Sequence, residues 1–187
     1  QRQLLGPAVP VCMDSTCFCV PDLSSDIETM ANGMMISLMQ ARAGILEAWL
    51  LSSRNEIITS AMPVPPEIRK ALTGFIREDI LAQARFKISD TSSINLGDLA
   101  IDYGDLLIGN SVAAITLIDV IVFRSAEDAY KDPALWAHEL AHVAQFLTWG
   151  TAEFSYLYVV DSKNVEAQAN LVGLEFLDWQ QTHEPSL

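Results

Sequence analysis

The feature that most constrains the fold is a helix whose two ends are both marked in the sequence. Asp132 is a favourable N-cap residue, and Pro133 suits the first helical position. Gly150 is a residue that commonly ends a helix. The sequence therefore predicts a helix from Pro133 to about Thr148, and this helix carries His-Glu-Leu-Ala-His at 138–142.

Two histidines at this spacing lie on the same face of a helix. Four residues advance by about 400°, so the side chains stand one turn apart and about 40° from alignment. His138 and His142 are therefore candidate ligands of one Zn²⁺ ion, and Glu139 is the candidate general base that takes a proton from water. The alternative is a helix whose histidines only face solvent or the core.

A catalytic zinc site needs a third protein ligand and an open position for water. His183, the only other histidine, lies in a polar tail, so we favour Glu166 in the next predicted helix. Residues 146–160 leave room for the chain to turn back between the two helices. Asn170 lies one turn after Glu166 and is expected to hydrogen-bond a ligating imidazole. The alternatives are a solvated carboxylate at 166 and no such role for Asn170.

Two tyrosines lie between the predicted metal-binding helices. Tyr156 and Tyr158 are therefore candidate catalytic residues that stabilise the oxyanion formed during acyl transfer. The alternative is that both side chains only pack in the core.

The remainder of the chain reads as helices around a small sheet, an α+β domain. Pro-rich residues 62–66 are the clearest break, so we predict an N-terminal part at 1–62 and a second domain at 63–187. Residues 1–23 read as irregular. The predicted helices cover 26–61, 67–76, 78–85, 133–148 and 161–181, and the extended segments cover 86–89, 94–101, 102–107, 111–117 and 120–124.

The helix predicted at 26–61 has apolar residues, many of them methionines, at helical spacing. This pattern favours packing against the protein's own core. Three other uses stay open: binding a lipid, binding a protein partner, or covering the cleft as an inhibitory segment. A large exposed apolar patch on 27–51 would favour the first two.

Charge and composition exclude several partners. The chain has 187 residues, 24 acidic and 11 basic, with a net charge of −13. Such a chain is unsuited to bind nucleic acid or an anionic membrane surface. The apolar runs 30–51 and 106–123 contain charged or polar residues, so no integral membrane span is expected. One disulfide from Cys12 to Cys17 or Cys19 would fit an exported protein, and the alternative is three reduced thiols.

The segment Trp136–Gln145 resembles the zinc motif of the bacterial eCIS core domain family, a metallopeptidase-like family named for extracellular contractile injection systems. Weaker similarity extends over about 63–180 and includes 149–154, 165–169 and the strand 114–123. The resemblance implies a zincin-like fold and a gluzincin-like site with His138, His142 and Glu166 as zinc ligands and Glu139 as the base. Thermolysin-like gluzincins have Asp where this chain has Asn170.

The leading hypothesis is a secreted or periplasmic bacterial zinc metallopeptidase that hydrolyses peptide bonds in a peptide or protein substrate. In zincin-like folds an edge strand pairs with extended substrate, and we expect the strand ending at Phe123 to be that strand. The alternative is a non-catalytic, metal-stabilised scaffold of a secretion or injection assembly, with a protein partner bound through the N-terminal helix. Glu139 favours catalysis, because a structural zinc site needs no base.

Overall fold

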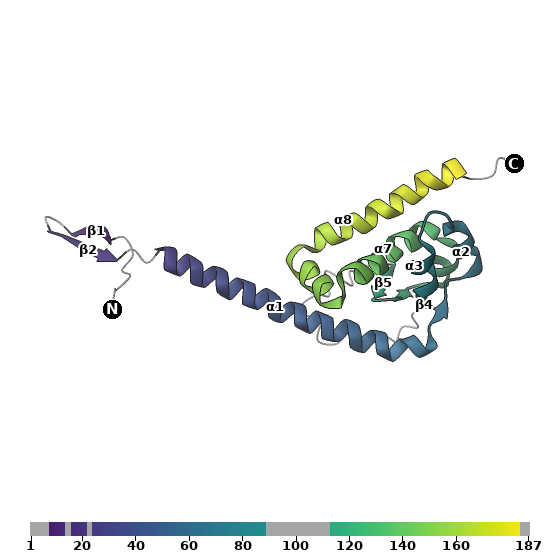
Figure 1. Cartoon of the computed structure of the whole chain (residues 1–187), viewed down its shortest axis with the longest axis horizontal. Helices are drawn as coiled ribbons and strands as arrows, with labels where there is room; N and C mark the ends of the chain where they lie inside the picture. The colour runs from purple at the N-terminus through teal and green to yellow at the C-terminus, as the bar shows by residue number, and fades with distance from the viewer. Residues whose placement is uncertain (1–7, 14–15, 22–23, 89–112, 184–187) are drawn as a thin grey trace. The chain divides into compact units, whose positions relative to one another are not determined.

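The computed structural model describes residues 8–13, 16–21, 24–88 and 113–183 (Figure 1). The chain divides into two compact units, residues 1–41 and 42–187, which are treated separately. The boundary predicted at 62/63 falls inside the second unit. Helix α1 (Ser24–Ile57) contributes its first part to one unit and its second part to the other.

The first unit contains a hairpin that the sequence did not predict. Strands β1 (Ala8–Met13) and β2 (Thr16–Pro21) pair antiparallel, whereas residues 1–23 were expected to be irregular. Valine and other β-forming residues recur in both strands, and this preference outweighs the prolines that suggested irregular chain. The register sets Cys12 opposite Cys17, and Cys19 opposite Pro10. The disulfide stays a prediction.

Helix α1 is long, and the exposure of its apolar side chains differs between its first and second parts. Large apolar side chains are exposed in its first part, at Met30, Met34, Met35, Ile36 and Leu38. In its second part, Ala43, Leu46, Leu50 and Ile57 are buried, as expected for a helix that packs on its own core. Of the described helices, the one over Glu28–Ser60 is long and apolar enough to cross a membrane by length and composition. The expected absence of a membrane span therefore stays a prediction.

A four-stranded mixed sheet forms the centre of the second unit. Its order is β3 (Met62–Pro63), β4 (Arg85–Ile88), β6 (Val120–Phe123) and β5 (Ala114–Leu117). β4 and β6 are parallel, and the other pairs are antiparallel. The prediction that the strand ending at Phe123 lies at the edge was wrong, because β6 bonds to β4 as well as to β5. Among the described strands, β5 is the edge strand next to the candidate site.

Short helices complete this unit and confirm the α+β class. They are α2 (Pro66–Leu72), α3 (Glu78–Gln83), α6 (Ala126–Lys131) and the 3₁₀ turn η1 (Ile58–Ser60). α2 and α3 are shorter than predicted, and α6, which the sequence did not predict, begins at the N-cap Ser125. The expected segments 94–101 and 102–107 lie outside the described residues.

Two apolar clusters hold the sheet between the helices. Phe86, Phe123 and Trp136 pack edge-on or tilted in one cluster, and the Trp136 Nε1–H donates to the Ala129 carbonyl at 2.8 Å. Phe146 and Phe154 stack at 3.8 Å between ring centroids in the other. The helix that carries both histidines is therefore anchored at its two ends by separate parts of the core.

The two long helices after the sheet, α7 (Pro133–Trp149) and α8 (Thr151–His183), lie side by side (Figure 1). The Asp132 carboxylate accepts the Leu135 N–H at 2.9 Å, and Gly150 ends α7 with φ +80°, so both predicted ends are confirmed. Residues 151–160 were expected to form a turn, but they are helical. The break predicted near Asp161 is present as one non-helical residue inside α8.

Candidate metal centre

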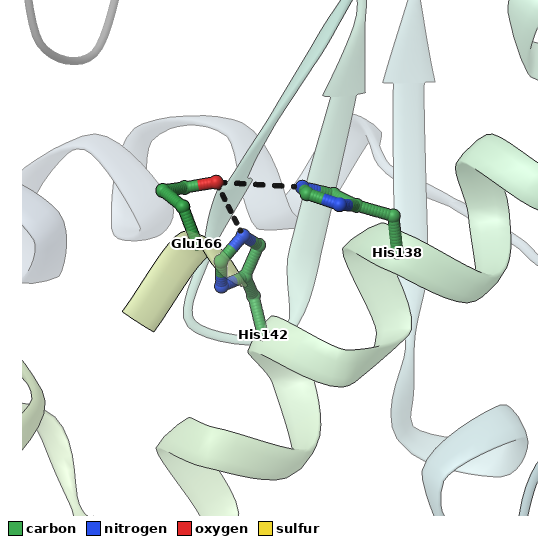
Figure 2. Close-up of side chains that lie close together, drawn as sticks. All are labelled: His138, His142 and Glu166. Atoms are coloured by element: carbon green, nitrogen blue, oxygen red, sulfur yellow. Dashed lines mark ion pairs between the residues drawn. The ribbon is translucent and has the colours of Figure 1, made fainter. Parts of the chain in front are cut away.

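His138, His142 and Glu166 converge from two helices (Figure 2). Both histidines project from α7, and Glu166 projects from α8 after its break at Asp161. Glu166 Oε2 lies 3.6 Å from His138 Nε2 and 3.5 Å from His142 Nε2. Three atoms suited to bind a metal lie within 4.8 Å of one another.

These distances fit a shared cation. Ligand atoms about 2.1 Å from a tetrahedral zinc ion are about 3.4 Å apart, which is close to the two nitrogen–oxygen distances. The same distances are long for direct hydrogen bonds. Two imidazole nitrogens and one carboxylate oxygen are also a donor set that zinc uses in enzymes. The residues present therefore fit a Zn²⁺ ion, with His138, His142 and Glu166 as the protein ligands.

A close approach of the helices makes this convergence possible. A Cβ atom at Gly173 would lie 3.3 Å from the Ala134 carbonyl oxygen and 3.6 Å from His138 Cβ. Gly173 follows Glu166 by two helical turns on the same side of α8. Glycine at this position therefore lets α8 approach the histidine-bearing part of α7.

Burial and neighbouring charges set the protonation of the ligands. Burial and the neighbouring His142 lower the pKa of His138. Burial also lowers the pKa of His142, but the facing carboxylates of Glu166 and Glu139 outweigh it and leave that pKa raised. Burial raises the pKa of Glu166, but His142 and the Tyr158 hydroxyl outweigh it and leave that pKa lowered. Glu166 is therefore held as a carboxylate, the form that binds a cation.

Glu139 lies beside the three ligands but faces the sheet. Its side chain is buried, and Oε1 lies 4.0 Å from His138 Nε2. Its other oxygen, Oε2, accepts a 2.6 Å hydrogen bond from the Thr116 hydroxyl on β5. Burial raises the pKa of Glu139 above its ordinary value. Thr116 was not predicted from the sequence, because nothing local to β5 indicates which strand residue faces α7.

The predicted tyrosines have different positions. The Tyr158 hydroxyl donates a 2.8 Å hydrogen bond to Glu166 Oε1, the carboxylate oxygen opposite the ligating one. Burial, followed by the charge of Glu166, raises the pKa of Tyr158. Tyr156 is half-buried and is not among the described residues that line the cavity. Asn170 lines the cavity, and its side chain partly offsets the lowering of the His138 pKa by burial and by His142.

Gln145 and His183 differ in their position relative to the ligands. Gln145 was missed, although it lies one turn after His142 on the predicted helix; its Oε1 is 2.9 Å from His142 Nδ1. His183 is exposed and stacks on Trp179, away from the three ligands, as expected of the polar tail.

The ligands open into a cavity of about 840 Å³. One wall is β5 with Ala113, and it includes Ile115 and Thr116 at the edge of the sheet. Apolar side chains also line the cavity, including Leu46, Leu50, Leu135, Leu174 and Leu177. Leu174 and Leu177 are also exposed to solvent. The site is therefore accessible among the described residues and bounded by a strand edge with unpaired backbone groups.

Comparison with known proteins gives one match. The family model of the eCIS core domain matches residues 109–149, which include β5, β6 and the helix with both histidines. This match supports the resemblance to the eCIS core family seen in the sequence. No curated protein and no solved structure matches the chain.

Proposed function

We propose that the protein is a zinc-dependent metallopeptidase. The observation that carries the proposal is the convergence of His138, His142 and Glu166 beside the buried carboxylate of Glu139, in an accessible cavity. A site that only stabilised the fold would need ligands but no buried acid next to them.

The chain's own residues account for the proton transfers of peptide hydrolysis. A bound Zn²⁺ ion would supply Lewis-acid activation of water and of the peptide carbonyl. Glu139 accepts one proton from the attacking water, whose oxygen bonds to the carbonyl carbon. When the carbon–nitrogen bond breaks, Glu139 passes that proton to the leaving amine. Thr116 holds Glu139 Oε2 and leaves Oε1 on the side of the histidines.

The edge of β5 provides a binding surface for substrate in this proposal. Its outer backbone groups are unpaired among the described strands, and the strand lines the cavity. An extended peptide can add to such an edge by β-augmentation, which presents its backbone carbonyls to the ligands. This assigns the substrate-pairing role to β5 instead of β6.

A second candidate is a metal-stabilised component of a bacterial injection assembly. The match to the eCIS core domain favours it, and the exposed apolar residues on the first part of α1 fit a protein partner. The metal would then join α7 to α8 and add to stability without catalysis. In both candidates we infer a secreted or periplasmic location.

Glu139→Gln separates the two candidates because it removes the base and keeps the side-chain shape. The metallopeptidase predicts that wild-type protein loaded with zinc cleaves members of an unstructured peptide library and that the variant does not, although both hold equal zinc. Leu147→Ala, an exposed change on the same helix, is the matched control and should cleave normally. Zinc bound by the wild type without Glu139-dependent cleavage would favour the assembly component.

A further inference from the structure

Gln145 links the two helices that carry the metal ligands. It is buried on α7, and its amide contacts both elements. On one side, Oε1 lies 2.9 Å from His142 Nδ1. On the other side, Nε2 donates to the Val165 carbonyl at 3.2 Å and contacts Gln168 Oε1 at 3.4 Å. Val165 immediately precedes Glu166, so one amide connects two ligand positions.

The partners of this amide leave it one favourable orientation. A backbone carbonyl accepts hydrogen bonds and cannot donate them, so the NH₂ group of Gln145 must face Val165. The reversed amide would place two oxygens against each other in a buried site, which is unfavourable. The carbonyl oxygen of Gln145 therefore faces His142, and it can accept a hydrogen bond but cannot donate one.

We infer that Gln145 is a positioning residue that fixes His142 in the Nδ1–H tautomer. With its hydrogen on Nδ1, the neutral imidazole carries its lone pair on Nε2, the atom 3.5 Å from Glu166 Oε2. The consequence for metal binding rests on the proposed function, but the tautomer follows from distances within the chain. The Gln145 oxygen lies at hydrogen-bonding distance from Nδ1, 2.9 Å, whereas the competing Glu166 carboxylate is 3.5 Å from Nε2, which is long for a hydrogen bond. Gln145 thus supports His142 as a ligand without touching a metal or a substrate.

Two substitutions separate the effect of the hydrogen bond to His142 from that of the hydrogen bond to Val165. Gln145→Met keeps the length of the side chain but removes all the hydrogen bonds of the amide. Gln145→Glu keeps an acceptor for His142 and loses the donor to Val165. Gln168→Met is the matched control, because Gln168 is an exposed glutamine that contacts the same amide from its far side.

The test is long-range ¹H–¹⁵N correlation of the imidazoles in metal-free protein, at a pH high enough that a further increase no longer changes the His142 signals. We expect the Nδ1–H tautomer for His142 in wild type, Gln145→Glu and Gln168→Met. In Gln145→Met we expect the signal to move towards the Nε2–H form. The inference would be overturned if His142 carried its hydrogen on Nε2 in the wild type, or if its tautomer were unchanged in Gln145→Met. If Gln145→Met does not fold, the spectra of the wild type and of Gln145→Glu decide.

Zinc titration adds the second readout. The dissociation constant should rise by about 10–100-fold in Gln145→Met and stay within about twofold of wild type in Gln168→Met. An unchanged constant in Gln145→Met would contradict the positioning role. Failure of the wild type to bind zinc would refute the proposed metal function and leave the tautomer result to decide the inference.

Discussion

Replacing Tyr158 by phenylalanine would remove the hydroxyl group behind Glu166 while keeping the ring. In the structure that hydroxyl donates to Glu166 Oε1 at 2.8 Å, and the ring stacks on Phe154 at 5.6 Å between centroids. A hydrogen bond to a charged group contributes about 1.5–3 kcal/mol. Because the Glu166 side chain is 37% exposed, solvent screening reduces this to about 1–2 kcal/mol.

That loss would appear as weaker zinc binding. If the hydroxyl holds Glu166 in its ligating position, 1–2 kcal/mol corresponds to a dissociation constant about 5–30-fold higher. Zinc titration against a competing chelator measures this, with Tyr156→Phe as the matched control because Tyr156 does not line the cavity. Unchanged zinc affinity with a large fall in kcat would refute this reasoning and favour the oxyanion role predicted from the sequence.

Three further predictions concern stability. Burial raises the pKa of Glu139, so its protonated form suits the folded state at acid pH, and the folded state loses stability as the pH rises above the ordinary glutamate range. Glu139→Gln should therefore raise the Tm of metal-free protein by about 2–8 °C at pH 8. Near pH 4 the same substitution should leave the Tm unchanged. Arg54→Ala removes two hydrogen bonds to Asp119 and should lower Tm by about 2–4 °C. This effect should be absent in an Asp119→Ala background, which has no acceptor for Arg54. Gly173→Val should destabilise by about 1–3 kcal/mol in urea unfolding and weaken zinc binding, because its side chain meets α7; equal zinc affinity would contradict that contact.

The histidine-bearing helix and its ends were predictable because the determining interactions are local. Asp132 caps the N-terminus through its own side chain, and Gly150 ends the helix with its own backbone conformation. The same holds for the break at Asp161, whose carboxylate accepts the Asn164 N–H. Helical geometry alone then places His138 and His142 on one face.

Interactions between distant segments were not predictable from the sequence. Residues 151–160 contain Tyr158 and Val160, which have little local preference for helix, and burial of Phe154 and Tyr158 against the core favours helix there. The edge position of β5 depends on the parallel pairing of β4 with β6, across a long separation in sequence. The bond from Thr116 to Glu139 depends on the same sheet order.

The polar network around the ligands falls between these two cases. Helical spacing places Gln145 near His142, but only the packing of α8 reveals that Val165 fixes the orientation of its amide. Asn170 was predicted from its spacing after Glu166, and it does line the cavity. The sequence therefore indicates candidate neighbours, while the atoms that meet depend on how two helices pack.

Calorimetric zinc titration of the purified chain tests whether His138, His142 and Glu166 together bind one metal ion. We expect one zinc per chain for wild type and for Glu175→Gln, which removes an exposed carboxylate from the same helix. Glu166→Gln should bind at least about 10-fold more weakly, because it loses a charged ligand. If the wild type bound no zinc, or if Glu166→Gln and Glu175→Gln bound it equally well, these three residues would not be the metal ligands.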